Sequence, residues 1–337
     1  GDEVNSSSVL ILNSVPLVSQ VILNTTSSTN DTTQNLTGYV IALDVDFDNV
    51  TYAYNWYKNG TLNATSLITD GLVGYWPLDN DVMDYWGSND GINNGTTRNV
   101  AGKVGGTYEL NGSNYIDCGN DSSLNIPREI TVSFWAKPFS LGPWETMIGK
   151  NLYNAPTDLG SYIFKLDGSL NVYLFVNLEG GSNIGIQASN YVPFIDEWNY
   201  FAFTFNGSTA NIYMNGTLIG TQSVPTNLIN ITNNVPLTFG VGKDHEGNLE
   251  QYFFNGSIDE VMVFNRSLTS TEIQRVYVGG ITGGNILNPS QTTVGDSWKL
   301  GVRGLDYSSI GDEVNSSSIE ILNYCGNNIK EGNETCD

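Results

Sequence analysis

Alternation of apolar and polar side chains with a period of two residues is the feature that most constrains the fold of this chain. In the segment ITVSFWAKP, for example, Ile130, Val132 and Phe134 share one face of an extended strand. The dipeptide Asn215-Gly216 joins two such segments and predicts a type I′ hairpin, since both central positions need positive φ. Because alternating segments and Gly/Asn-rich turns recur throughout, the sequence predicts an all-β fold made of β-sandwiches.

One segment, LTSTEIQRVY, departs from this pattern. Thr269 and Glu272 have the spacing of a capping box, in which each residue caps the backbone of the other at a helix start. We therefore expect one short helix, packed across a sandwich edge.

Charge is sparse and strongly negative. The chain has 35 acidic and 13 basic residues, giving a net charge of −22. This charge argues against nucleic acid and anionic lipid as partners, and it suits cation binding. Since no apolar run approaches the roughly 18 residues that a membrane helix needs, we expect no membrane insertion within this segment. The start at Gly1 instead of Met indicates a mature or excised segment of a longer polypeptide.

Acceptor triplets for N-glycosylation, Asn-x-Ser/Thr, occur seventeen times. The composition alone would give roughly seven by chance. The excess predicts a glycosylated protein outside the cell, and the alternative is accidental triplets in an Asn/Ser/Thr-rich chain. The acceptors are Asn5, Asn24, Asn30, Asn35, Asn49, Asn59, Asn63, Asn94, Asn111, Asn120, Asn206, Asn215, Asn230, Asn255, Asn265, Asn315 and Asn333.

The middle of the chain resembles the laminin G-like jelly rolls of the concanavalin A-like superfamily. The resemblance rests on motifs that occur in the family's order, among them GLVGYWPLDND, GGTYELNGSNYIDCGN and EITVSFWAKP. The closing motif NGSIDEVMVFNRSLTSTEI is the most specific. The resemblance implies a jelly-roll sandwich over residues 70–284.

The two flanks resemble a second kind of domain. Each contains an alternating strand with a tryptophan, Trp56 in the first flank and Trp298 in the second, but neither has enough strands for a sandwich of its own. Together, residues 14–69 and 285–323 resemble an immunoglobulin-like domain of archaeal and bacterial surface proteins. The jelly roll would then be an insertion in a discontinuous immunoglobulin-like sandwich.

A peptide is echoed at the two ends of the chain. The sequence GDEVNSSS occurs at residues 1–8 and again at 311–318, and similar strand-like residues follow, so the leading copy spans residues 1–13 and the trailing copy spans 311–323. We interpret residues 1–13 as the last strand of a preceding immunoglobulin-like domain in an array. The alternative is a strand donated to a neighbouring copy of the protein.

The three cysteines are too few for a disulfide-built scaffold. Cys118 is expected to be a core residue. The tail, residues 324–337, resembles the start of a Cys-rich repeat of surface proteins. Cys325 and Cys336 then pair either with each other or with cysteines outside this segment.

Catalytic groups are scarce. The only histidine, His245, lies in a polar loop and predicts no nucleophile–base arrangement. Asp259 and Glu260 are adjacent on a predicted strand, so we expect them to point to opposite faces and not to act on one substrate. The sequence therefore predicts no enzyme.

A structural Ca²⁺ site is the stronger chemical candidate. The loop DNDVMDYWGSNDG supplies several oxygen ligands, which are Asp79, Asp81, Asp84, Asn89 and Asp90. The family resemblance implies Asp84, Asn89 and an acid of the closing motif, Asp259 or Glu260, as ligands. The alternative is an acidic loop without metal.

Carbohydrate binding is the family's other recurrent use. It requires exposed rings that stack on sugars, and Trp144, Tyr153 and Tyr191 lie in loop-like stretches. The alternative for each of them is packing at the rim of a sandwich.

Together these features predict a non-enzymatic, glycosylated, extracellular adhesion protein that forms one unit of a cell-surface array or filament. Its partners would be neighbouring copies or adjacent repeats, and surface glycans. The alternative is the carbohydrate-binding portion of a secreted glycan-degrading enzyme.

Overall fold

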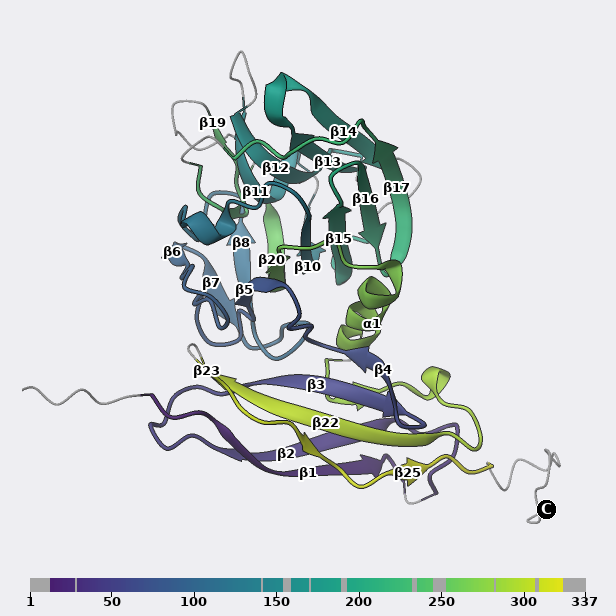
Figure 1. The fold of residues 1–337 in the computed structure, drawn as a ribbon. Helices are drawn as coiled ribbons and strands as arrows, with labels where there is room; N and C mark the ends of the chain where they lie inside the picture. Colours follow the sequence, from purple (N-terminus) through teal and green to yellow (C-terminus); the bar gives the residue numbers. More distant parts are fainter. Residues whose placement is uncertain are drawn as a thin grey trace, which may run out of the picture.

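The computed structural model describes residues 13–27, 29–140, 142–153, 159–169, 171–188, 193–231, 235–244, 253–281, 283–306 and 309–323. Two β-sandwiches are stacked one on the other (Figure 1). The one α-helix found among the described residues lies near their junction. The prediction of an all-β fold with one short helix is confirmed.

Strands from both ends of the chain form the lower sandwich in Figure 1, called the end sandwich below. One of its sheets has the order β1-β2-β21, and the other has β22 at its centre, paired with β3, β23, β24 and β25, while β4 pairs with β3. The strand bounds are β1 (Leu17–Thr25), β2 (Leu36–Leu43), β3 (Thr51–Lys58), β4 (Thr61–Thr65), β21 (Ile286–Leu287), β22 (Ser297–Asp306), β23 (Ser309–Ile310), β24 (Val314–Asn315) and β25 (Ile319–Glu320).

Pairing of β3 with β22 joins segments that are far apart in the sequence. The two strands run antiparallel along their whole length, and their inward residues Trp56 and Trp298 are both 0% exposed. The two indole rings meet edge to face at 6.5 Å, and Trp56 Nε1 donates a hydrogen bond to the carbonyl oxygen of Gly284 (2.9 Å). The two flanks of the chain thus share one core. Its immunoglobulin-like identity stays a prediction.

The upper sandwich is formed by the middle of the chain and is called the jelly roll below. One sheet has the order β17-β16-β15-β10-β20-β8-β7, with β5 paired to β20, and the other has the order β14-β13-β12-β11-β18-β9-β6, with β19 paired to β11. The bounds are β5 (Leu72–Trp76), β6 (Ile92–Asn94), β7 (Thr97–Asn99), β8 (Thr107–Asn111), β9 (Tyr115–Asp117), β10 (Ile130–Pro138), β11 (Glu145–Tyr153), β12 (Leu159–Leu166), β13 (Val172–Asn177), β14 (Asn183–Ala188), β15 (Asn199–Phe205), β16 (Thr209–Met214), β17 (Thr217–Ser223), β18 (Thr238–Phe239), β19 (Lys243–Asp244) and β20 (Asn255–Phe264).

The core of the jelly roll lies between these sheets. Ile130, Val132 and Phe134 all point into it, as their alternation predicts. The predicted hairpin joins β16 to β17, and Asn215 and Gly216 have φ values of 49° and 75°. A type I′ turn needs this positive φ at both positions.

The helix α1 (Ser270–Gly280) begins as the sequence predicts. The Thr269 hydroxyl accepts a hydrogen bond from the Glu272 N–H (3.3 Å), and the Glu272 carboxylate accepts one from the Thr269 N–H (2.8 Å). Three short 3₁₀ segments, η1 (Ser122–Leu124), η2 (Glu179–Gly181) and η3 (Pro289–Gln291), lie in loops. None of the helices in the described part of the chain is long and apolar enough to cross a membrane.

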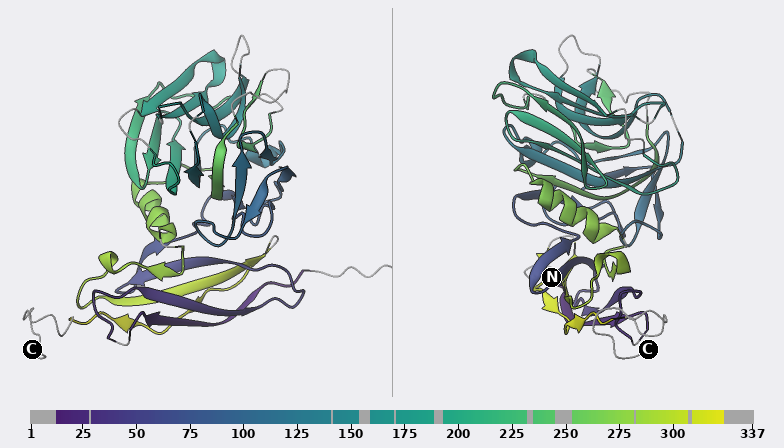
Figure 2. Two further views of the ribbon diagram at one scale, coloured as in Figure 1. Left: turned by 180° about the vertical axis from the view of Figure 1, so that it is seen from behind. Right: turned by 90° about the vertical axis from the view of Figure 1, so that its right-hand side faces the viewer.

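A shared apolar cluster joins the two sandwiches, and Figure 2 shows α1 at this junction from two sides. The end sandwich contributes Ala53 and Leu305, and the outer face of the β10–β15–β20 sheet contributes Trp135, Tyr200 and Met262. The outer face of this sheet is therefore covered by the helix and the end sandwich.

The trailing copy of the echoed peptide lies along β22, through β24 and β25. The leading copy, apart from Asn13, lies outside the described residues, as do His245, Tyr191 and the tail with Cys325 and Cys336. Cys118 is buried in the core, as expected, and forms no disulfide within the described part of the chain.

Candidate functional sites

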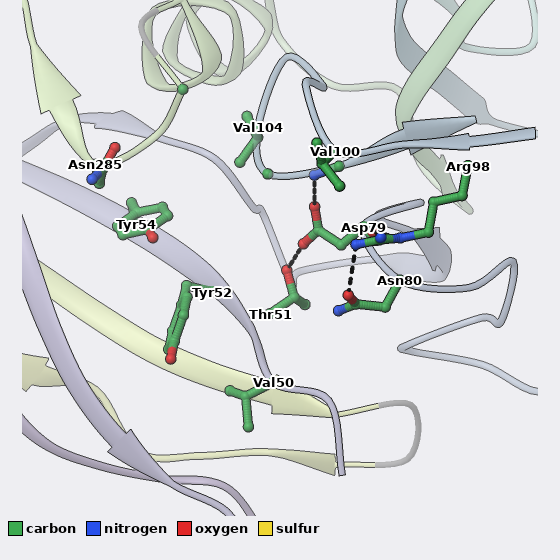
Figure 3. Close-up of a pocket in the computed structure, with 13 residues that line it drawn as sticks. Val50, Thr51, Tyr52, Tyr54, Asp79, Asn80, Arg98, Val100, Val104 and Asn285 are labelled. Carbon is green, nitrogen blue, oxygen red and sulfur yellow. Dashed lines mark hydrogen bonds between the residues drawn. The ribbon is translucent and has the colours of Figure 1, made fainter. Parts of the chain in front are cut away.

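A polar groove of about 410 Å³ lies between the two sandwiches (Figure 3). From the end sandwich it is lined by residues around the start of β3, among them Thr51, Tyr52 and Tyr54. From the jelly roll it is lined by loops that carry Asp79 and Arg98. Aromatic rings and hydrogen-bonding groups thus face the same space.

Asp79, a predicted metal ligand, is committed to hydrogen bonds in this groove. Its carboxylate accepts hydrogen bonds from the Thr51 hydroxyl and from the Gly106 N–H (2.7 Å), as the dashed lines in Figure 3 show. Arg98 Nε donates to the Asp79 carbonyl oxygen (2.6 Å). Burial raises the pKa of the Asp79 carboxyl. The side chain therefore ties β3 of the end sandwich to a jelly-roll loop.

Asp259 and Glu260 lie on the same face of β20, contrary to the expectation from strand alternation. The pairing of β10 with β20 shifts register opposite Phe134, and Glu260 has a φ of 52°, which marks a β-bulge. Because the bulge inserts one residue, Ile258 and Val261 both point into the jelly-roll core, and the two acids between them both point away from it. The predicted opposite orientation is wrong for this reason.

Both acids are enclosed, with 0% and 2% of their surfaces exposed. The Asp259 carboxylate accepts hydrogen bonds from the N–H groups of Lys103 (2.7 Å) and Val104 (3.1 Å). The Tyr75 hydroxyl donates to Glu260 Oε2 (2.9 Å), while the buried Glu260 Oε1 has no hydrogen-bond partner in the described part of the chain. Burial first, and then neighbouring negative charge, raises the pKa of both acids well above the usual range. This pair holds the loop of Lys103 in place and is closed to a dissolved substrate.

The predicted Ca²⁺ loop around Asp84 is organised by hydrogen bonds. The Asp84 carboxylate accepts from the backbone N–H groups of Tyr75, Trp86, Gly87 and Asn89, and also from the Asn89 side-chain amide, at 2.9–3.1 Å.

Two further oxygens of this loop are also engaged. The Asn89 carbonyl accepts from Trp76 Nε1 (3.0 Å), and Asp90 Oδ1 accepts from the Asp84 N–H (3.0 Å). A cation would have to displace these donors, so the geometry favours a hydrogen-bonded turn. Ca²⁺ binding here stays a prediction.

One acidic trio brings its carboxylates together, and it does not belong to the predicted set. Among the described residues, Asp44, Asp46 and Asp48 are the one group of at least three His, Cys, Asp or Glu side chains whose ligand atoms all lie within 4.8 Å. Asp79, Asp84, Asp90, Asp259 and Glu260 form no such group. The alternating acids of DVDFD were the signal that the sequence analysis missed.

Of the three aromatic residues predicted to bind carbohydrate, Trp144 is the one whose side chain the structure describes. It is 39% exposed, and its ring lies 4.7 Å from that of Tyr173, which in turn stacks on Phe175 at 6.0 Å. Tyr173 and Phe175 are half-buried on the outer face of β13, because Val172, Leu174 and Val176 point into the core. We call Trp144, Tyr173 and Phe175 the aromatic row. The Tyr153 side chain and all of Tyr191 lie outside the described residues.

Polar and small residues border the aromatic row. On β14, Gln187 is opposite Tyr173 and Gly185 is opposite Phe175, and both β14 residues are exposed. The Tyr173 hydroxyl donates to Asp167 Oδ2 (3.1 Å), which fixes the ring at the strand end. The row therefore presents a rigid aromatic surface with amide and carboxylate groups at its edge.

The glycosylation acceptors that lie among the described residues are accessible enough to be modified. Asn5 and Asn333 lie outside the described residues, and none of the other fifteen is buried. Glycan occupancy stays a prediction.

Residues 110–274 match a laminin G family model described as the concanavalin A-like lectin/glucanases superfamily. This match confirms the resemblance for the jelly roll. No curated protein sequence matches the chain.

Solved structures similar to the chain include the binding domain of Paraclostridial mosquitocidal protein 1, at 18% identity and a TM-score of 0.51 over 62% of this chain and 52% of that one. Domain 4 of the extracellular arabinanase AbnA from Geobacillus stearothermophilus, in complex with arabinotriose, has 20% identity and a TM-score of 0.48 over 61% and 98%. A Trypanosoma rangeli sialidase mutant has 17% identity and a TM-score of 0.49 over 64% and 34%. The chain thus spans about half of the toxin domain and about a third of the sialidase. The likeness to the toxin domain shows a shared fold.

Proposed function

Residues 110–274 carry a concanavalin A-like lectin/glucanase domain, and on this premise we propose that the protein is a non-enzymatic adhesion module of the cell surface that binds glycans through its jelly roll. The module would be glycosylated and would form one unit of an extracellular array. The toxin domain that shares the fold is itself a binding domain, which supports a binding role.

The observation that carries the glycan proposal is the aromatic row. Tyr173 contacts both Phe175, beside it on the outer face of β13, and Trp144, from the loop before β11. The apolar faces of sugar units can stack on exposed rings of this kind. Gln187, from the neighbouring strand, supplies an amide for sugar hydroxyls. Gly185 leaves room beside Phe175, because a Cβ at that position would lie 3.4 Å from the Phe175 ring.

The non-enzymatic part of the proposal is supported by the burial of the paired acids. Glycoside hydrolysis needs two carboxyl groups that flank a bound sugar. Asp259 and Glu260 share a face but are enclosed, and their hydrogen bonds serve Tyr75 and the loop of Lys103.

The array part is supported by the contacts of the trailing copy of the echoed peptide. Glu313 accepts hydrogen bonds from Asn55 Nδ2 (2.6 Å) and the Tyr57 hydroxyl (2.8 Å), the Ser316 hydroxyl accepts one from the Leu300 N–H (3.0 Å), and Ile321 is buried.

Each of these side chains recurs in the leading copy, as Glu3, Ser6 and Ile11. The leading copy therefore has the residues needed to complete another sandwich of this kind. Electron microscopy of the native assembly tests whether the leading copy completes another sandwich. We expect density for residues 1–13 along the β22 of an adjacent sandwich. Residues 1–12 packed along the β22 of their own chain would refute it.

Glycan binding is tested with Trp144→Ala and Tyr173→Ala, each compared with the wild type on a glycan array. Tyr39→Ala is the matched control, because Tyr39 is an exposed aromatic residue on β2 of the end sandwich. Loss of one stacking ring should weaken affinity about tenfold, or roughly 1.4 kcal/mol. Wild-type binding by both row variants, or no glycan binding by the wild type, would refute the proposal.

A further inference from the structure

We propose that Asp44, Asp46 and Asp48 bind a Ca²⁺ ion in the loop between β2 and β3 of the end sandwich. This site is independent of the glycan proposal and of the predicted Ca²⁺ loop around Asp84.

The trio is brought together by local geometry. The loop between Leu43 at the end of β2 and Thr51 at the start of β3 carries an acid at every second position. The N–H groups of Asp46 (2.9 Å) and Asp48 (3.2 Å) both donate to Asp44 Oδ1, which curls the loop around this side chain. One oxygen from each of the three carboxylates consequently lies within 4.8 Å of the others.

A buried oxygen without a partner points independently to a ligand. Asp44 is 6% exposed, and its Oδ2 is buried with no hydrogen-bond partner among the described residues. Leaving a charged oxygen in this state is costly unless a cation or a donor compensates it. Since Oδ1 is occupied by the two N–H groups, Oδ2 is the oxygen of Asp44 that remains for a cation.

No Lys or Arg of the described residues forms an ion pair with the trio. The ion pairs found among the described residues involve Asp70, Asp296, Glu272 and Glu313, and none includes the trio. A fourth acid, Asp306 at the end of β22, lies close enough to add to the negative potential. Its charge acts on Asp48 together with those of Asp44 and Asp46.

The donor set selects the type of cation. All three side chains offer carboxylate oxygens, which hard cations prefer, and no thiol or imidazole is included. Acids at the first, third and fifth positions are the spacing by which a Ca²⁺ loop of the EF-hand kind begins, although Asn49 stands where that loop has glycine. Ca²⁺ accepts irregular sets of six to eight oxygens completed by carbonyls and water, whereas Mg²⁺ demands a near-ideal octahedron. The site therefore favours Ca²⁺.

The site lies where the leading copy of the echoed peptide meets the end sandwich. Ser14 donates its N–H to the Asp46 carboxylate, and the Asn13 side chain donates to Asp306 (2.8 Å). Asn13 is the last residue of the leading copy of the echoed peptide, and Ser14 follows it. A bound Ca²⁺ would thus fix the point where that peptide joins the end sandwich.

The test is calorimetric titration of the full chain, stripped of metal by chelator, with CaCl₂. The wild type should bind one Ca²⁺ with a Kd on the order of 10⁻⁴ to 10⁻³ M, as extracellular sites do, and its Tm should rise in 10 mM CaCl₂. The variant Asp46→Asn/Asp48→Asn should lose at least tenfold in affinity and show no rise in Tm.

Two control variants make the test specific. Asp312→Asn removes an exposed acid elsewhere on the end sandwich and should bind as the wild type does. Asp90→Asn removes an exposed acid of the Asp84 loop and should also leave binding unchanged. Circular dichroism checks the fold, and if the double variant does not fold, Asp46→Asn alone replaces it, because Asp46 is exposed. The proposal is overturned if the wild type binds no Ca²⁺, if the trio variant binds like the wild type, or if Asp90→Asn alone abolishes binding.

Discussion

The contact of Gly279 with β4 predicts that one added methyl group weakens the junction of the two sandwiches. Gly279 lies in the last turn of α1 and is buried against β4. A Cβ built at this position would lie 2.1 Å from the Thr65 carbonyl oxygen and 2.8 Å from the Ser66 nitrogen, while ordinary contacts begin at 3.4 Å. Both are backbone atoms, which cannot rotate away as a side chain can. In Gly279→Ala, helix and strand must therefore move apart by roughly 1 Å.

The expected cost follows from two opposing effects. Overpacking of a well-packed contact costs about 1–3 kcal/mol. Alanine is a better helix former than glycine by up to about 1 kcal/mol, and this gain offsets part of the cost. The net loss of unfolding free energy should be about 1–2 kcal/mol, which lowers Tm by roughly 2–8 °C for a domain of this size.

Differential scanning calorimetry measures the effect, and Gln274→Ala is the control. Gln274 lies on the exposed side of the same helix, so its replacement should change stability by less than about 0.5 kcal/mol. Hydrogen exchange should also quicken in α1 and β4 of Gly279→Ala. An unchanged or raised Tm for Gly279→Ala would show that the helix is not held against β4 as described.

Two further predictions concern pH. Arg266 hydrogen-bonds Glu272 and lowers the pKa of that carboxyl to about 2, below its usual 4.5, so the stabilisation is present above pH 4.5 and is lost as pH falls toward 2. Urea unfolding at pH 7 and pH 3 should therefore show a smaller acid loss for Glu272→Gln than for the wild type, and an equal loss would contradict this assignment. Burial raises the pKa values of Asp79, Asp259 and Glu260, so the folded state binds protons that the unfolded state releases. The stability that these three acids contribute therefore falls as pH rises from about 4 through the raised pKa values. The fall in Tm between pH 5 and pH 8 should be smaller for Glu260→Gln, and a fall equal to that of the wild type would mean that Glu260 does not titrate in this range.

Local patterns in the sequence predicted local structure well. Alternation placed Ile130, Val132 and Phe134 on the core face, the Asn215-Gly216 dipeptide predicted its turn, and Thr269 with Glu272 predicted the helix start. In each case the physical cause lies within a few neighbouring residues, namely side-chain direction, permitted φ or capping.

The features that the sequence did not reveal depend on partners far away in the sequence. The bulge at Glu260 arises from the pairing of β20 with β10, and no pattern within the IDEV segment reveals it. The saturation of Asp84 by N–H donors depends on how its loop closes on β5. Tyr173 and Phe175 belong to an alternating segment, and only the arrangement of the sheets shows which side of that segment faces outward.

The two proposed sites lie on opposite parts of the molecule, and this separation bears on how an adhesion unit would work. The β10–β15–β20 sheet turns its outer face to α1 and the end sandwich, so the outer face of the other sheet, with the aromatic row, points away from them (Figure 1). A force on a glycan held by the row would pass through the jelly-roll core to Trp135 and α1, and from there through the Gly279 contact into β4. The acidic trio and the echoed peptide lie on the end sandwich, on the far side of that contact. Under the proposed function, binding and assembly would thus be altered separately, and Gly279→Ala should weaken one of the contacts that join the two sandwiches.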